Sequence, residues 1–285
     1  MNLNKTPLDD EIIEKLNDRR NKIVSRTGGW FAGKGVYSHG YSMLDELVGH
    51  KSYFQILILN ATGKLVERNI ADCVEAIYGC LSWPDPRIWC NQIGALAGAA
   101  RTSPITATVM GCLATDSKAY GVLPIADCAR FIQQALKKIQ SGMSIEQLLE
   151  ETFAANNGKK FVVGYKRPIA KGDERIVTME KVCKTLGISE GPHLELAYDI
   201  EKVLMEEFDE SMNIGGYVAA LLSDQDFSAD EIYQLLSTLV ASGVTACYLD
   251  VLHQPTDSFL PLRCDDMDYQ GKPPRSLPKK TIGAD

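Results

Sequence analysis

After residue 60 the sequence contains almost no alternating apolar–polar pattern of the kind that forms half-buried strands. Apolar residues recur instead at helical spacing, between recognisable helix start signals. Ser144 with Gln147 forms one capping pattern, and Ser228 precedes acidic residues in another predicted first turn. We therefore predict an all-α protein with a short hairpin in residues 28–42. The predicted helices cover residues 9–26, 52–60, 67–82, 86–101, 104–116, 124–141, 144–155, 173–186, 191–207, 212–224, 228–242 and 243–254.

The overall composition is that of a folded protein, with 45% hydrophobic and 24% charged residues in a chain of 285. The 37 acidic residues outnumber the 30 basic ones, and the net charge of -7 argues against nucleic acid or an anionic membrane as the main partner. The chain has no apolar run of the roughly 18 residues that a membrane span requires, and its N-terminus lacks an apolar signal stretch. We expect a cytoplasmic protein that spans no membrane.

The eight cysteines are scattered along the chain without CxxC spacing, and the four histidines show no metal-site spacing. Most of the cysteines lie in apolar, helix-like contexts. We expect buried free thiols, and no bound metal.

One predicted helix region is unusually poor in side-chain bulk. The stretch at residues 91–114 contains Gly94, Gly98 and several alanines, which allow a neighbouring helix backbone to approach closely. We predict a buried helix pair here. A two-fold interface between subunits and a packed pair within one chain explain these residues equally well.

A basic loop interrupts the helices at residues 158–175. It contains Lys166, Arg167 and Lys171 among glycines, a combination that can hold phosphates or carboxylates. A solvated basic loop is the alternative interpretation. The C-terminal tail, residues 272–285, is rich in proline and basic residues and is expected to be an extended arm or a disordered end.

Five segments, taken in order, resemble motifs of the citrate synthase family and its citryl-CoA-lyase-like branch. DPRIWCNQIGALAGAARTSP (85–104) is similar to that family's D-x-R-x-W-x-N segment, and GYSMLDELVGHKSYFQ (40–55) to its G-Y-D-x-x-E-L-I-G block. GYKRPIAKGDER resembles the loop G-F-G-H-x-x-x-K-x-D-P-R, SMNIGGYVAALLSD the N-V-D segment, and LRCDDMDYQG the terminal R-P-x-x-x-Y-x-G, with one extra residue. The resemblance covers residues 33–271.

The resemblance implies a homodimer that binds an acyl-CoA and a small keto acid or other carboxylate in a cleft, with no permanently bound cofactor. It implies a large helical domain formed by residues 1–116 and 222–285, which includes an N-terminal arm (1–27) and the tail. Residues 117–221 would form a smaller, mobile helical domain.

The resemblance also implies two catalytic histidines and a catalytic aspartate, and this sequence departs from all three. The motifs place Tyr120 at the first histidine, Arg167 at the second and Gly215 at the aspartate. A glycine supplies no base, a tyrosine is a poor base at neutral pH, and an arginine polarises an oxygen without moving protons.

Carboxylate binding is better preserved than catalysis. Arg167, Arg175 and Arg263 match or join positions where guanidinium groups grip carboxylates. Lys166 and Lys171 are the candidates for contact with CoA. The alternative is that Arg175 and Arg263 merely form ion pairs with neighbouring acids, such as Asp173.

Two functional hypotheses follow. The first is a non-standard enzyme that forms or cleaves a carbon–carbon bond at an acyl-CoA, as an acyltransferase or a citryl-CoA-lyase-type lyase, with Tyr120 and Arg167 as its catalytic residues. The second is a catalytically inactive pseudoenzyme that senses a ligand or binds a partner as a dimer.

Overall fold

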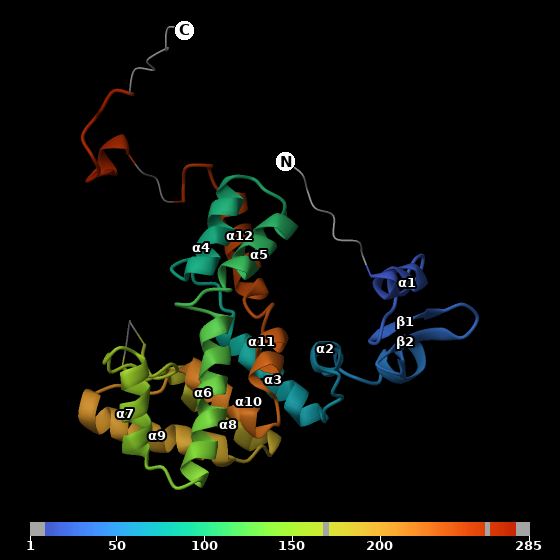
Figure 1. Cartoon of the computed structure of the whole chain (residues 1–285). Helices are drawn as coiled ribbons and strands as arrows, with labels where there is room; N and C mark the ends of the chain where they lie inside the picture. The colour runs from blue at the N-terminus through green and yellow to red at the C-terminus, as the bar shows by residue number, and fades with distance from the viewer. Residues whose placement is uncertain (1–8, 168–170, 260–262, 278–285) are drawn as a thin grey trace.

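The computed structural model describes residues 9–167, 171–259 and 263–277. It is built mainly of helices, as the sequence predicts (Figure 1). The first part contains α1 (Asp10–Asp18), the antiparallel strands β1 (Gly28–Phe31), β2 (Gly35–Ser38) and β3 (Tyr41–Ser42), and the π-helix η1 (Met43–Leu47). The helices that follow are α2 (Tyr53–Thr62), α3 (Arg68–Leu81), α4 (Trp89–Ala99), α5 (Pro104–Ala114), α6 (Val122–Gln140), α7 (Ile145–Ala155), α8 (Glu174–Leu186), α9 (Pro192–Phe208), α10 (Ile214–Asp224), α11 (Ala229–Leu235), α12 (Ala241–Leu252) and the 3-10 turn η2 (Cys264–Asp266).

Local capping signals set most helix boundaries. The hydroxyl groups of Ser52, Ser144 and Ser228 each accept a hydrogen bond from the N–H of the third helical residue, whose side chain accepts one from the N–H of the serine. These reciprocal bonds satisfy backbone N–H groups that a helix start leaves unpaired. Gly63 and Gly187 end α2 and α8 in the left-handed conformation that glycine adopts without strain.

The main hydrophobic core fills the lower bundle of Figure 1. It joins apolar side chains of α2 and α3 to those of α6 through α11, with Ile58, Ile132, Ile200 and Leu222 among the fully buried members. Cys73, Cys128 and Cys183 are free thiols buried in this core.

A separate layer of α4, α5 and α12 stands above the main core (Figure 1). A Cβ atom on Gly94 would lie 2.6 Å from the Val244 carbonyl oxygen, and one on Gly98 would lie 2.5 Å from that of Tyr248. The close helix pair that the small residues predict therefore forms within one chain, between α4 and α12. The main-chain atoms of these two helices are in direct contact because glycine has no side chain.

The predicted helix 228–242 is wrong in its second half. The helix α11 ends at Leu235, and the chain turns before α12 begins at Ala241. Leu239 still belongs to the main core, whereas Val240 packs with Cys90 and Val244 in the upper layer. The break is needed because the chain passes from one core to the other at this point.

The N-terminal part, residues 9–46, has no buried residue. The hairpin is confirmed, with β1 paired to β2 and β2 to β3. The helix predicted at 9–26 is shorter than expected: it ends at Asp18, and Asn21 is left-handed. A left-handed residue cannot continue a right-handed α-helix, so the helix stops before Asn21. Residues 1–8 of the predicted arm lie outside the described residues.

The division into a large part (1–116 and 222–285) and a small part (117–221) stays a prediction. The main core contains helices from both parts, and the boundary at 221/222 falls inside α10. Residues 272–277 of the tail form neither helix nor strand, and 278–285 lie outside the described residues. Across the described ranges, no helix is both long enough and apolar enough to cross a membrane.

We predict that Gly98→Ala lowers the free energy of unfolding by about 1–3 kcal/mol, because its methyl group would force α4 away from α12. Urea denaturation followed by circular dichroism measures this change. The matched control is Gly79→Ala on the exposed side of α3, where a Cβ meets nothing within 4 Å. That variant should gain about 0.5–1 kcal/mol from helix propensity. Equal effects at the two positions would contradict the close contact.

Candidate functional site

The polar centre of the structure is the carboxylate of Asp173, whose side chain is completely buried. Asp173 is the N-cap of α8 and accepts a hydrogen bond from the Arg175 N–H. Its Oδ2 also accepts one from the N–H of Ile214, the first residue of α10, at 2.9 Å. One carboxylate therefore joins the N-terminal ends of two helices, where the helix dipoles favour a negative charge.

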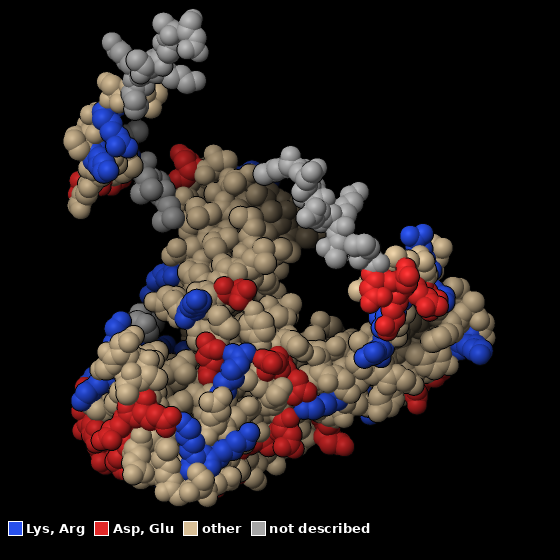
Figure 2. Space-filling view, viewed as in Figure 1, with Lys and Arg blue, Asp and Glu red and all other residues tan. Residues whose placement is uncertain are grey.

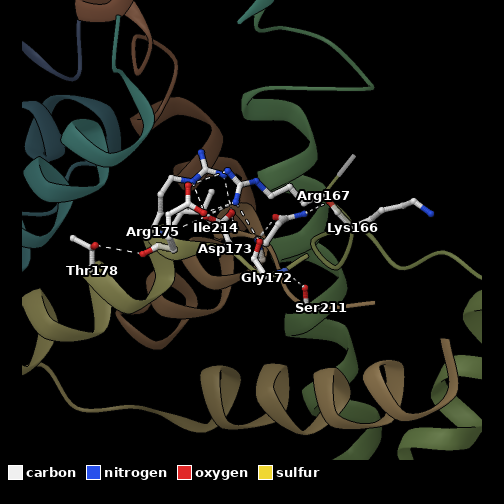
Figure 3. A network of polar contacts seen from close by, with 11 residues as sticks. Lys166, Arg167, Gly172, Asp173, Arg175, Thr178, Ser211 and Ile214 are labelled. Atoms are coloured by element: carbon white, nitrogen blue, oxygen red, sulfur yellow. Dashed lines mark hydrogen bonds and ion pairs between the residues drawn. The ribbon is translucent and has the colours of Figure 1, made fainter. Parts of the chain in front are cut away.

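Two arginines converge on Asp173 (Figure 3). Arg175 binds it in a two-pronged manner, with Nε to Oδ1 and Nη2 to Oδ2, both at 2.7 Å. Arg167 Nη1 lies 3.8 Å from Asp173 Oδ1. The Arg175 guanidinium also lies over the ring of Trp83, with Cζ 5.4 Å from the ring centroid. Such a cation–π contact helps to fix the position of the guanidinium.

Arg167 has a second acidic partner, Glu174. Its Nη1 and Nη2 donate to the two carboxylate oxygens at 2.5 and 3.1 Å, and Nη1 also donates to the Gly172 carbonyl oxygen. The side chain of Arg167 is only 12% exposed, whereas that of Glu174 is 68% exposed. Glu174 is therefore the solvent-exposed partner of this ion pair.

The surrounding charges lower the pKa of both carboxyl groups. Burial alone would raise the pKa of Asp173, but hydrogen bonds from Arg175 and the Ile214 N–H outweigh it and lower the value. The hydrogen bond from Arg167 lowers the pKa of Glu174 to about 2. Both acids are therefore ionised at neutral pH, and they balance the charges of the two arginines.

The ends of the basic loop are tied to the segment before α10. Asn213 donates from Nδ2 to the Lys166 carbonyl oxygen, and Ser211 accepts from the Gly172 N–H. The two lysines that the sequence suggests for CoA contact are paired with acids: Lys166 with Glu210 at 2.8 Å, and Lys171 with Asp209. Residues 168–170 lie outside the described part of this loop.

Gly215 lies beside this network, as the second residue of α10. A Cβ there would be 3.0 Å from Asn213 Oδ1 and 3.3 Å from Ile125 Cγ1. The structure therefore brings together Arg167, Arg175 and the backbone at Gly215. The carboxylate at this place comes from Asp173, which is held by Arg175 and is unsuited to act as a free base.

Tyr120 and Arg263 do not join the cluster in any described contact. Tyr120 is half exposed, and its ring packs against Trp89 at the start of α4, with centroids 5.2 Å apart. Arg263 is exposed in the segment beyond α12, and its backbone N–H donates to the Asp266 carboxylate at 2.8 Å.

Sequence reasoning missed Glu174 and Trp83 as parts of the site. A signal for Glu174 was present, because it stands where the D-P-R motif has proline, directly between Asp173 and Arg175. Trp83 lies 92 positions before Arg175, and no local pattern links the two. Among the described residues, no group of three or more histidine, cysteine or acidic side chains is arranged to hold a metal ion.

Comparison with solved structures establishes the fold as that of the citrate-synthase-like proteins. Citryl-CoA lyase from Hydrogenobacter thermophilus matches 90% of this chain and 97% of its own, with a TM-score of 0.75 and 23% identity. ATP citrate lyase from Methanothrix soehngenii, solved with citrate and coenzyme A, matches 99% of this chain but only 46% of its own (TM-score 0.70, 17% identity). Citrate synthase from Thermoplasma acidophilum, in a ternary complex with carboxymethyl coenzyme A and oxaloacetate, matches 80% of this chain and 59% of its own (0.60, 16%). No protein-family model and no curated protein sequence matches the chain.

We predict that Asp173→Ala lowers the free energy of unfolding by about 3 kcal/mol, because it removes the cap of α8 and leaves a partly buried guanidinium unpaired. Urea denaturation at neutral pH measures this loss. The control is Asp199→Ala, which removes an exposed ion pair with Lys202 and should change stability by less than about 1 kcal/mol.

The stability difference between the native chain and Asp173→Ala should also depend on pH. A carboxyl group whose pKa is lowered in the folded state stabilises the fold above its unfolded pKa of about 4, and this contribution disappears as the pH falls. The stability difference between the native chain and Asp173→Ala should therefore shrink below about pH 4. A constant difference down to pH 2 would contradict the ionised, paired state of Asp173.

Proposed function

We propose that this protein binds a small di- or tricarboxylate of the citrate class at Arg167 and Arg175, together with an acyl-CoA, as a homodimer. The observation that carries this proposal is the pair of guanidinium groups around Asp173, in a fold shared with proteins solved with citrate, coenzyme A or oxaloacetate. Arginine forks match the geometry of carboxylates, and their shielding from water strengthens the contact.

Glu174 acts as an internal stand-in for the ligand in this proposal. It grips Arg167 through both carboxylate oxygens, which is the contact that a ligand carboxylate would make. Because its side chain is mostly exposed, it can swing into solvent when a ligand arrives. The cost is modest since the exchange replaces one carboxylate–guanidinium pair with another.

The reaction proposed for an active protein is formation or cleavage of a carbon–carbon bond next to the acyl thioester, in the class of acyltransferases or citryl-CoA-type lyases. Arg167 would polarise a carbonyl oxygen, and Arg175 would hold a carboxylate. Tyr120 would have to approach this site from its position against Trp89. Gly215 supplies no base, so proton removal from an acyl thioester lacks a contribution worth about 10²–10⁴-fold.

A second candidate function is a pseudoenzyme that senses the ligand. The ion pair between Arg167 and Glu174 favours it, because Arg167 stands at a position of a motif histidine and Glu174 at that of the motif proline. The positive charge of Arg167 and the negative charge of Glu174 compensate each other in this ion pair. A binding site without a mobile proton donor is suited to recognition rather than turnover.

The homodimer is supported by an apolar face on α5. Ile105, Val109 and Leu113 are 76%, 49% and 69% exposed and follow one another at four-residue spacing, with Leu249 of α12 also exposed. This upper layer is largely free of charged side chains in Figure 2, unlike the lower bundle. In a chain of net charge -7, an uncharged face is where two copies meet with the least repulsion. The motif resemblance adds that Arg263 of a second copy would reach toward the site of the first.

We predict that Glu174→Gln strengthens citrate binding about 3- to 10-fold, whereas Arg167→Ala weakens it by at least about 10-fold. Isothermal titration calorimetry with citrate, in the presence and absence of CoA, measures both changes. Glu150→Gln, at an exposed position of α7, is the control. It makes the same change in net charge away from the site and should leave the citrate affinity unaltered.

Turnover then separates the two candidate functions. The lyase is supported if the native chain releases oxaloacetate from citryl-CoA and the folded Arg175→Ala variant does not. The sensor is supported if the chain binds citrate without turnover. Rapid formation of citrate from acetyl-CoA and oxaloacetate would contradict the proposal that catalysis is weakened by the absence of a base at Gly215. Unchanged citrate affinity in both Glu174→Gln and Arg167→Ala would place the ligand elsewhere.

For the dimer, we expect Leu113→Glu to produce monomers, because it buries an unpaired charge in each half of a two-fold interface. Sedimentation velocity measures the oligomeric state. Val177→Glu replaces an equally apolar, exposed residue on α8 and should remain dimeric. If Leu113→Glu and Val177→Glu both sediment like the native chain, the α5 face is not the dimer interface.

A further inference from the structure

Two cysteines that the proposed function does not use lie side by side in the main core. Cys73 belongs to α3 and Cys183 to α8, and their sulfur atoms are 4.0 Å apart. Both are free thiols and almost fully buried. The helices that carry them pack against each other, so the pair is held close by the fold.

Cys183 alone of the two lines a cavity of about 550 Å³. This cavity lies between the C-terminal half of α8, the start of α9 and α10, and its walls include Glu180, Lys184, Glu190 and Tyr217. The charged wall and the volume admit water and small polar molecules. A reagent that enters the cavity therefore reaches Cys183 before Cys73.

Hydrogen bonds favour the thiolate of Cys183. The Cys73 thiol is placed to donate to its sulfur, and the Tyr217 hydroxyl donates to it at 3.7 Å. The Cys73 contact, with help from Tyr217, lowers the pKa of Cys183, against the opposing effects of burial and of Glu180. Elsewhere in the chain, burial raises the pKa of Cys90 to about 11 and that of Cys128 to about 12.

We propose that Cys183 and Cys73 form a peroxide-reactive dithiol, in which Cys183 attacks the oxidant and Cys73 completes a disulfide. The Cys183 thiolate attacks one oxygen of hydrogen peroxide and the O–O bond breaks, which leaves a sulfenic acid and a hydroxide that takes up a proton to form water. The Cys73 sulfur then attacks the Cys183 sulfur, the S–O bond breaks, and a second water leaves. Two thiols and one peroxide give one disulfide and two waters, so the sulfurs lose the two electrons that the peroxide gains.

The disulfide requires a local movement, because its sulfurs must approach from 4.0 Å to about 2.05 Å. Rotation of the two side chains on helices that already touch can provide this approach. The product would tie α3 to α8, the helix whose first turn carries Asp173 and Arg175. The oxidised pair would thus fix the helix that positions the candidate site.

The test is oxidation of the native, full-length protein with a small excess of hydrogen peroxide near neutral pH. After quenching and alkylation, mass spectrometry of a non-reduced digest should show a Cys73–Cys183 cross-link that dithiothreitol removes. In the unoxidised protein, Cys183 should react with iodoacetamide at least about 10-fold faster than Cys128. These measurements need no variant, so misfolding does not affect them.

Three variants assign the roles of the two sulfurs. Cys73→Ser should leave a sulfenic acid at Cys183 that dimedone labels, and Cys183→Ser should form neither the sulfenic acid nor the cross-link. Cys128→Ser is the matched control, since it removes another thiol of the same core and should oxidise like the native chain. Absence of the cross-link in folded native protein, or sulfenic acid formation at Cys73 before Cys183, would overturn the proposal.

Discussion

The arrangement of this protein around its polar site depends on one buried carboxylate. Asp173 ends the basic loop, caps α8, receives the first N–H of α10 and holds Arg175 through two hydrogen bonds. A charge in such a position is tolerated only when every partner is present, because a buried carboxylate without hydrogen bonds costs several kcal/mol. The need to satisfy the buried Asp173 carboxylate therefore positions the loop, the two helix ends and the two arginines together.

The ion pair between Arg167 and Glu174 gives this site its particular character. A permanently charged guanidinium stands where the motif resemblance places a histidine, and an exposed acid next to it compensates the charge. In the proposed function, a ligand carboxylate must compete with this internal carboxylate for Arg167. The proposal therefore favours ligands with several carboxylates, because a single carboxylate would only replace Glu174, whereas a second one could also contact Arg175.

Local sequence signals predicted most of the fold, and long-range packing explains the failures. Capping residues such as Ser144 and Ser228 mark their helix starts directly, since the hydrogen bonds involved span three residues. The end of α11 escaped prediction because Leu239 and Val240 serve different cores, a distinction that periodicity does not contain. In the site, Arg167 and Arg175, which stand in the same loop motif, both lie beside Asp173. The position of Tyr120 against Trp89 and the stacking of Arg175 on Trp83 are tertiary contacts without a local signal.

The layer of α4, α5 and α12 has a consequence for how the chain is made. Its helices α4 and α5 are synthesised before most of the main core, yet the glycine face of α4 packs on α12, more than 140 residues later. Until α12 leaves the ribosome, α4 and α5 have only each other to pack against, and a helix pair of this size is marginal alone. The upper layer therefore matures last, and the apolar face of α5 becomes a rigid surface only after the lower bundle has already formed.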